Sequence, residues 1–352
     1  MKKNILPLWL VCPAILFLLL ICQVAPAGAG DEKAPGQPRL LYTIKNGKGA
    51  EQMNWFTDKG KIEAGHLRGP GAVLALNDEL RLFADTLNQR LVLRKADSGR
   101  VVKIFDLPAS KEVELKYNPL IIDLADAGNG IIYAADESNM VIWKIDLGKN
   151  WRGAEMKVKG LFRFEGAAEK AGAEKKDAVK DLKNKAHQLN RIFAGAGGVL
   201  YAVDMAQQNT VAFNSDGSKK FTYEGLTNGV PDRNGLLYHP IYYGDSAVRD
   251  IEIFDAKGRM AGDHGRLNFD RPVSYIAPLG FDSEDTLYIF ADSEKGPLAV
   301  RIYRKDKKQV FTVLSACDNS GFGSAPYWIG PAGSLEWAEY SADSVKIYRI
   351  EL

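Results

Sequence analysis

The sequence predicts an all-β fold, a six-bladed β-propeller whose blades are four-stranded antiparallel sheets. Three observations support this prediction: a repeated pattern, its spacing, and the turn residues that separate the strands. The pattern is an apolar strand that ends in an acid, followed by a polar turn and a second, alternating strand. It occurs at Asp85, Asp136, Asp204 and Asp292, and at Glu339 with glutamate in place of aspartate. Such a period is typical of radial β architectures.

The spacing of these acids divides the chain into units of blade size. The steps between them are 51, 68, 88 and 47 residues. The longest step fits two units, because Asp245 lies inside it and an alternating strand follows at 251–255. Units of about 40–50 residues suit blades of four strands each. Six units therefore fit the chain, although the pattern does not place the first strand of the fourth.

The local chemistry of each unit agrees with short antiparallel strands. Alternation with a period of two residues gives each strand one inward face and one outward face. Steps such as Gly128-Asn129-Gly130 and Asp216-Gly217 end the strands, since these residues adopt the positive φ of tight hairpins. The repeated acid stands where a strand meets its turn, and a carboxylate there accepts backbone N–H bonds. We expect these acids to stabilise turns rather than to act in catalysis.

Two copies of the pattern resemble the NHL repeat. They lie at 83–93 and 135–142, and each has a strand that ends in Ala-Asp, then a polar turn with Asn, then alternating apolar residues. The segment 69–73 (Gly-Pro-Gly-Ala-Val) is similar to the strand that opens a blade in that family. The resemblance extends over most of 68–352, but units three to six lack the Asn-His-Arg-like turn. It implies a six-bladed propeller that binds protein or RNA, and the motif itself carries no active site.

The ring is expected to close through the two ends of the chain. The last unit ends directly after an alternating strand at 345–350, which leaves room for only three strands. Near the start of the mature chain, residues 39–44 form an isolated strand pattern. We expect this N-terminal strand to pair as the missing outer strand of the last blade. An unrelated edge strand is the alternative.

Residues 1–29 are expected to form a secretory signal peptide. Lys2-Lys3 precede a mostly apolar run, and small residues around Ala29 form cleavage patterns directly before the first acid. An uncleaved anchor is one alternative, and two prolines within the run argue against it. A lipoprotein is another, but Ile21 before Cys22 is larger than lipidation requires. We expect cleavage between Gly28 and Asp31, a periplasmic or secreted protein, and no stable membrane anchor afterwards.

The mature chain is expected to contain one domain. A linker at 30–37 leads into a propeller at 38–352, and a charged insertion interrupts the propeller at 165–188. The insertion is rich in Ala, Lys and Glu, with charges spaced as on a solvated helix. We expect a tolerated surface insertion; a partner-binding arm is the alternative.

Cysteine count and charge exclude some classes of protein. Cys12 and Cys22 belong to the signal peptide, so Cys317 alone remains and no internal disulfide can form. The chain has 46 Lys and Arg against 44 Asp and Glu, with no sustained basic stripe. Because nucleic-acid binders carry such a stripe, we expect no nucleic-acid partner, and we expect a monomer.

Catalytic patterns are few. No Gly-rich phosphate loop, His-Glu-x-x-His or Gly-x-Ser-x-Gly motif is present. A zinc site such as that of amidating lyases would need three histidines to meet on the axis, from His66, His187, His239 and His264. We place His187 in the solvated insertion. A gluconolactonase-like cation site would draw on Asp204, Asn209, Asp245 and Asp292. The segment 123–130 has oxygens suited to calcium but is interpreted as a hairpin.

Aromatic side chains gather in two units and mark the best place to look for a site. They are Tyr238, His239, Tyr242 and Tyr243 in the fourth unit, and Tyr327, Trp328, Trp337 and Tyr340 in the sixth. Most should pack between blades, and any that face the channel would suit a sugar, peptide or apolar ligand.

We therefore expect a binding or scaffolding module for a protein, peptide or carbohydrate, with no cofactor, no metal and no assigned catalytic residue. The alternative is a metal-dependent hydrolase or lyase, gluconolactonase-like or amidating-lyase-like, with its site on the propeller axis.

Overall fold

The structure is a computed structural model of the chain. It describes residues 31–33, 37–54, 72–151, 155–163, 187–241, 246–294, 296–303, 305–314, 327–330, 333–341 and 343–352. Several features predicted from the sequence lie outside these residues: the signal peptide, His66, Asp245, Cys317, Tyr242, Tyr243 and the insertion up to residue 186. In the described part of the chain, no helix has the length and apolar character needed to span a bilayer.

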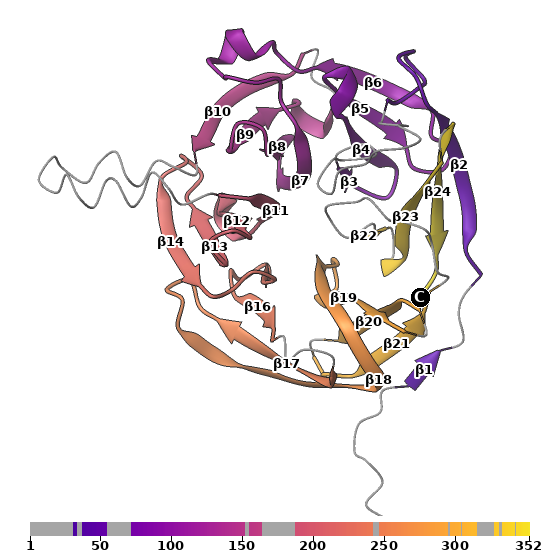
Figure 1. Ribbon diagram of the computed structural model, residues 1–352, viewed down its shortest axis with the longest axis vertical. Coiled ribbons are helices and arrows are strands. Elements are labelled where there is room, and N and C mark those ends of the chain that lie inside the picture. Colours follow the sequence, from indigo (N-terminus) through magenta and orange to yellow (C-terminus); the bar gives the residue numbers. More distant parts are fainter. Residues whose placement is uncertain are drawn as a thin grey trace, which may run out of the picture.

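The protein is an all-β propeller, with sheets standing around a common axis (Figure 1). Four of the described sheets have four strands each. The first contains β3 (Val73–Ala75), β4 (Leu80–Asp85), β5 (Arg90–Lys95) and β6 (Val101–Asp106). The second contains β7 (Ile121–Gly128), β8 (Ile131–Asp136), β9 (Val141–Asp146) and β10 (Lys157–Arg163). The third contains β11 (Leu189–Ala194), β12 (Leu200–Asp204), β13 (Asn209–Phe213) and β14 (Lys219–Glu224). The closing sheet contains β22 (Tyr327–Ile329), β23 (Leu335–Tyr340), β24 (Ser344–Ile350) and β2 (Arg39–Lys45).

The fourth and fifth expected units are continuous with each other rather than separate. They share an eight-stranded sheet of β15 (Val230–Pro231), β16 (Leu237–Pro240), β17 (Ser246–Phe254), β18 (Met260–Phe281), β19 (Thr286–Ser293), β20 (Leu298–Tyr303), β21 (Gln309–Val313) and β1 (Asp31–Lys33). The cause is β18, which is 22 residues long. Its first half pairs with β17 and its second half with β19, and both pairings include Val273. The structure thus shows four separate blades and one larger sheet in the described residues, not six separate blades.

The predicted pairing of the N-terminal strand with the last strand is confirmed. β2 runs antiparallel to β24, with Arg39 opposite Arg349 and Lys45 opposite Ser344. In Figure 1, this indigo strand forms the outer edge of the closing sheet, beside the yellow strand β24. The closing sheet therefore combines strands from both ends of the chain.

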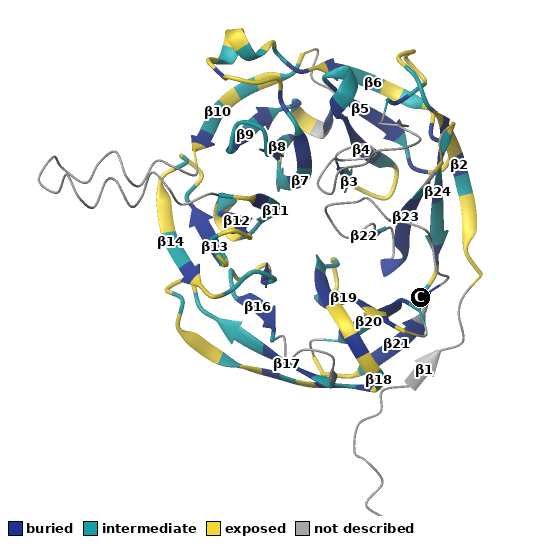
Figure 2. Ribbon diagram, viewed as in Figure 1, coloured by how far each residue is buried: buried dark blue, intermediate teal, exposed yellow. Residues whose placement is uncertain are grey.

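Apolar side chains fill the spaces between neighbouring sheets. One cluster between the first and second sheets includes Leu82, Leu93, Ile132 and Trp143, all buried. Figure 2 shows the same trend, because the middle strands are mainly dark blue and the outer strands carry most of the yellow residues. Burial of these faces supplies the main stabilisation of the ring, since the hydrophobic effect scales with the apolar area removed from water.

The hairpin predicted at 123–130 is confirmed, and its turn shows why glycine is present. β7 and β8 pair antiparallel around Asn129 and Gly130, which adopt φ values of 57° and 84°. A Cβ on Gly130 would lie 2.1 Å from the backbone oxygen of Gly148. Only glycine therefore fits this position without displacement of the neighbouring turn.

The turn-stabilising role predicted for the repeated acids is confirmed for Asp85, Asp136 and Asp204, which are all buried. Asp136 accepts bonds from the backbone N–H of Leu120 at 3.0 Å and from the indole Nε1–H of Trp143 at 3.1 Å. The prediction is wrong for Asp292, whose side chain is exposed. The first three acids each accept the N–H of an earlier residue, which is Asn54 for Asp85, Leu120 for Asp136 and Gln188 for Asp204.

Replacement of Asp136 by Ala should lower the free energy of unfolding by about 3 kcal/mol, because several buried donors would lose their charged acceptor. Urea denaturation followed by tryptophan fluorescence measures the change. Asp292→Ala is the matched control at the equivalent repeat position, and its effect should stay within about 0.5 kcal/mol. Equal losses for the two variants would contradict the assigned role of Asp136.

Candidate functional site

The inner strands of the propeller enclose a cavity of about 590 Å³ on its axis. Residues of β3, β7, β11, β15, β22 and the end of β18 line it. This volume falls within the roughly 300–1,000 Å³ of typical small-ligand sites. Because every sheet contributes to its wall, the cavity is the place where the whole ring converges.

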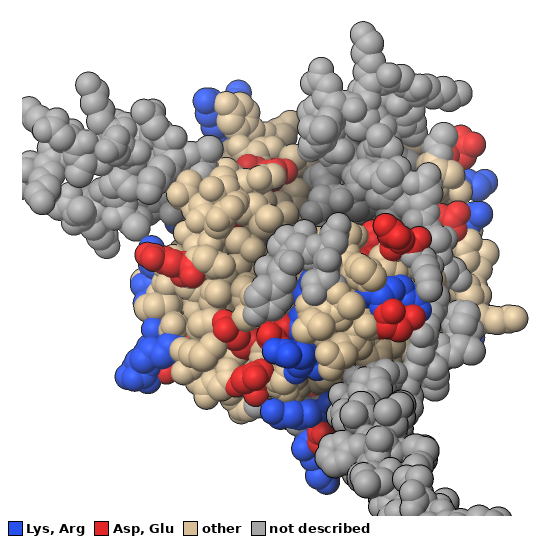
Figure 3. Space-filling model, turned by 60° about the horizontal axis from the view of Figure 1, so that its bottom comes forward, with Lys and Arg blue, Asp and Glu red and all other residues tan. Residues whose placement is uncertain are grey.

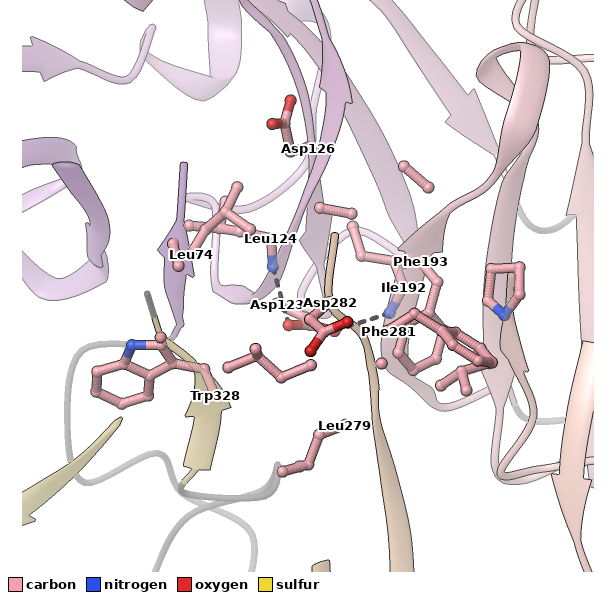
Figure 4. Close-up of a pocket in the computed structure, with 18 of the residues that line it drawn as sticks. Leu74, Asp123, Leu124, Asp126, Ile192, Phe193, Leu279, Phe281, Asp282 and Trp328 are labelled. Carbon is pink, nitrogen blue, oxygen red and sulfur yellow. Dashed lines mark hydrogen bonds between the residues drawn. The ribbon is translucent and has the colours of Figure 1, made fainter. Parts of the chain in front are cut away.

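Asp123 projects from β7 into this cavity (Figure 4). Its Oδ1 accepts a bond from the Leu124 N–H at 3.0 Å, and its Oδ2 accepts one from the Ile192 N–H on β11 at 2.8 Å. The pairing register of β7 shifts between Ile121 and Asp123. Such a bulge re-aims a side chain, and bulges are over-represented beside functional sites. The carboxylate thus both joins two neighbouring inner strands and faces the axis.

Burial shifts the pKa of Asp123 upward. Burial raises its pKa from 3.8 to about 6, while the positive charge of Arg191 and the N–H bonds from Ile192 and Leu124 limit the rise. Asp126, which also lines the cavity, has a pKa raised by burial and partly lowered by a bond from the Gly128 N–H. Groups with pKa values shifted by burial in a cavity are typical of functional sites.

Arg191 supplies a positive charge on the neighbouring inner strand. Its Nη1 donates to the Pro278 carbonyl at 2.6 Å, and its guanidinium carbon lies 4.7 Å from the centre of the Phe193 ring. The register of β11 is irregular between Leu189 and Ile192. A bulge therefore presents Arg191 next to the bulge that presents Asp123, and stacking on Phe193 restricts its orientation.

Three further acids in the cavity wall, Asp232, Asp282 and Asp285, have structural partners, and a fourth, Asp78, is exposed. Asp232 and Asp282 each accept bonds from two backbone N–H groups of their own turns. Asp285 pairs with Arg233, with 2.6 Å between Oδ1 and Nε. Asp232 and Asp282 therefore stabilise turns, and Asp285 forms a surface ion pair.

Aromatic side chains form the apolar part of the wall. Figure 4 shows Trp328 and Leu74 on one side of Asp123 and Phe193 and Phe281 on the other. Trp328 is held in place because its Nε1–H donates to the Glu336 carboxylate at 2.8 Å. Of the aromatic residues singled out in the sequence, Tyr327 and Trp328 line the cavity. Trp337 instead stacks on Tyr348 within the closing sheet.

Three members of the gluconolactonase-like set predicted from the sequence do not gather on the axis, and the fourth, Asp245, lies outside the described residues. Asp204 and Asn209 face each other across the hairpin from β12 to β13, Asp292 is exposed, and none of the three lines the cavity. The Asp204 carboxylate bonds the Gln188 and Gln207 N–H groups. Asp204 and Asn209 have oxygens suited to a cation, but they face each other at the end of the hairpin, where Asp204 bonds the turn.

The described histidines are also separate. His187, placed by the sequence in the solvated insertion, instead contacts Asp204, with 2.5 Å between Nδ1 and Oδ2. His239 is buried beside Phe254, and burial lowers its pKa to about 4. His264 packs against Tyr238. Within the described ranges, no three His, Cys, Asp or Glu side chains are grouped as metal ligands.

Exposed charges of both signs are mixed on the face drawn in Figure 3, where blue and red side chains alternate. Ion pairs with an exposed arginine, such as Arg259 with Asp255 and Arg266 with Asp250, also occur among the described residues. Pairs of this kind contribute little to stability. The drawn face therefore presents no large field of one sign among its described residues.

No protein-family model matches the chain, and no curated protein matches it in sequence. Solved structures similar to it include a structural genomics protein of unknown function from Bacteroides thetaiotaomicron. The TM-score is 0.51 at 12% identity, over 89% of this chain and 76% of that one. Hydrazine synthase of Kuenenia stuttgartiensis has a TM-score of 0.48 at 10% identity, over 79% and 76% of the two chains. Virginiamycin B lyase from Staphylococcus aureus has 0.46 at 13% identity, over 81% and 85%. At these identities the similarity concerns the fold alone.

Sequence reasoning missed Asp123 and Arg191 as axial residues. The available signal was a single charge inside an otherwise apolar strand, as in Ile121-Ile122-Asp123-Leu124-Ala125. The period-two pattern does not reveal a bulge, so it could not show which way these charges point.

Asp123 should titrate with a pKa of about 6 in the folded protein. Because this pKa lies above the unfolded value, the folded state binds the proton more tightly, and the contribution of Asp123 to stability should be lost as pH rises through about 6. Carboxyl ¹³C NMR measures the titration, and the signal that disappears in Asp123→Asn identifies the residue. Asp255, whose pKa hydrogen bonds from Arg259 lower to about 2, is the internal control. Titration of Asp123 near pH 4 would show that burial does not govern it.

Proposed function

We propose that this chain is an exported β-propeller whose axial cavity binds a protein segment, a peptide or a carbohydrate. The observation that carries the proposal is the cavity itself, which combines aromatic walls with the Asp123 carboxylate and the Arg191 guanidinium. Ligand sites are mostly apolar concavities with a few convergent polar groups. Trp328 offers a flat face to a sugar ring or to an aromatic side chain of a peptide.

The proposal includes six blades, with the eight-stranded sheet counted as two. In support, six segments line the axis: β3, β7, β11, β15, the end of β18 and β22. On this interpretation β18 crosses from the outer edge of one blade to the inner strand of the next. Resemblance to the NHL repeat remains part of this proposal, as do export through the signal peptide, a monomeric state and the absence of a nucleic-acid partner.

An enzymatic alternative has one observation in its favour, the position and pKa of Asp123. A carboxyl group with a pKa of about 6 can both accept and donate a proton near neutral pH. In that case the cavity would hold the substrate of a lyase or hydrolase, and Asp123 would act as its acid or base. For an enzyme, Asp123→Asn would abolish turnover and leave substrate binding measurable. For a binding module, there would be no turnover to lose.

Obstruction of the cavity mouth should abolish ligand binding. Ala196 is exposed and lines the mouth, so Ala196→Trp should narrow it without disturbing the core. Screening of peptides and oligosaccharides by thermal shift, followed by isothermal titration calorimetry, identifies binders. We expect a loss of at least tenfold in affinity for the variant, equivalent to about 1.4 kcal/mol.

Val102→Trp provides the matched control, because Val102 is 47% exposed on the outer strand β6, far from the axis in the ring. It should bind as the unmodified protein does. Ligands that bind both variants equally would place the site elsewhere and contradict the proposal.

A further inference from the structure

We infer that the ligand of the axial cavity is a zwitterion with an apolar side chain, either a free amino acid or a short peptide. Its ammonium group would bind the Asp123 carboxylate, and its carboxylate would bind the Arg191 guanidinium. This inference rests on the proposed axial binding site and narrows its ligand class.

The charges of Asp123 and Arg191 line one cavity but do not form an ion pair with each other. Among the described residues, no ion pair or hydrogen bond joins Asp123 to Arg191, although the Arg191 charge acts on the Asp123 carboxyl. The carboxylate is anchored to backbone N–H groups of β7 and β11, and the guanidinium is anchored to a carbonyl of β18. Opposite charges fixed separately can each bind one end of a ligand that bridges them.

Both groups keep bonding capacity beyond these anchors. An ionised carboxylate offers about four acceptor positions, and Asp123 has bonds at one position on each oxygen. A guanidinium has about five N–H donors in a planar fork, and Arg191 has one bond, from Nη1 to Pro278. Charge-assisted bonds of this type are stronger than neutral ones and set orientation.

Simpler ligands fit the charges less well. A purely anionic ligand would meet Asp78, Asp123 and Asp126, which line the same cavity as Arg191. A purely cationic ligand would meet Arg191. A zwitterion can place its ammonium beside Asp123 and its carboxylate beside Arg191, so each ligand charge meets an opposite charge. It is therefore favoured over a purely anionic and a purely cationic ligand.

The walls around the charges suit an apolar substituent. Leu74, Leu279, Phe281 and Trp328 come from three different inner strands and surround the cavity near Asp123 (Figure 4). Contact with such side chains removes apolar surface from water. An aromatic or branched aliphatic side chain is therefore expected on the ligand.

The test uses a matched series of probes measured by isothermal titration calorimetry at pH 7.5 with the mature protein. The zwitterions are L-phenylalanine, Gly-Phe and Gly-Gly-Phe, which separate the two charges by increasing distances and distinguish a free amino acid from a peptide. N-Acetyl-L-phenylalanine lacks the ammonium, and L-phenylalaninamide lacks the carboxylate. At least one zwitterion should bind about tenfold or more tightly than its masked forms, as expected for loss of a charged hydrogen bond.

Two variants separate recognition from a structural role. Asp123→Asn should remove the preference for a free ammonium and leave the preference for a carboxylate. Arg191→Gln should do the opposite. Circular dichroism and thermal unfolding confirm that each variant folds, and Val102→Trp serves as the unaffected control.

The outcomes separate this inference from the proposed function. Masked probes that bind as tightly as zwitterions, or variants that weaken every probe equally, would overturn it. If an uncharged oligosaccharide binds and Ala196→Trp blocks it while no zwitterion binds, the axial site stands and the inference falls. If no probe of any class binds the cavity, both fail.

Discussion

The buried carboxylate of Glu336 joins the two ends of the propeller. It accepts two bonds from Arg81 on β4 of the first sheet, at 2.7 and 2.8 Å, across 255 residues of sequence. Arg81 and Glu336 are both fully buried. Arg349, its neighbour on β24, adds further bonds to the same carboxylate. Burial would raise the pKa of Glu336, but Arg81 and Arg349 outweigh it and lower the pKa. A charge removed from water in this way is tolerated only because it is fully paired.

The position of Glu336 shows how this contact belongs to the repeat. It stands three residues before Glu339, as Tyr133 stands before Asp136 and Tyr201 before Asp204. The hydroxyl of Tyr133 donates to the Gly198 carbonyl, and that of Tyr201 donates to the Gly235 carbonyl. Each of these side chains therefore reaches the following sheet. At the closing seam, the interface between the closing sheet and the first sheet, the same repeat position carries an ionic contact instead of a neutral hydrogen bond. The ionic contact is more selective for its partner.

The closing seam also shapes the axial site. Glu336 accepts the indole N–H of Trp328, so one carboxylate fixes both the ring closure and an aromatic wall of the cavity. Asp123 acts similarly between the second and third sheets, since it bonds the Ile192 N–H. Groups held by the ring itself are pre-organised, which lowers the cost of binding a ligand.

The fold could be predicted from the sequence because its determinants are local. Alternating strands and glycine turns act within a few residues, and acids such as Asp136 bond the turn that follows their strand. The pairing of residues 39–44 with the last strand followed from strand count. The sequence could not show whether the fourth and fifth units form separate blades. β15 is only two residues long, and β18 continues from one unit into the next without a turn. The axial charges depend on bulges, and the Arg81–Glu336 contact spans most of the chain. The bulges leave no periodic signal, and the repeat position of Glu336 does not identify a partner 255 residues away. Asp204, Asn209 and Asp292, by contrast, resembled ligands by residue type alone.

A double-mutant cycle across the seam tests the central claim that Arg81 and Glu336 close the ring. Arg81→Met, Glu336→Leu and the double variant are compared by urea denaturation. Glu336→Leu leaves Arg81 buried without its carboxylate, and Arg81→Met leaves Glu336 with Arg349 as its remaining cationic partner. Each single change should cost about 3–5 kcal/mol, and the double change should cost less than the sum. A coupling energy of about 2 kcal/mol or more is predicted. A coupling energy near zero, with additive single effects, would show that the ring closes without this contact.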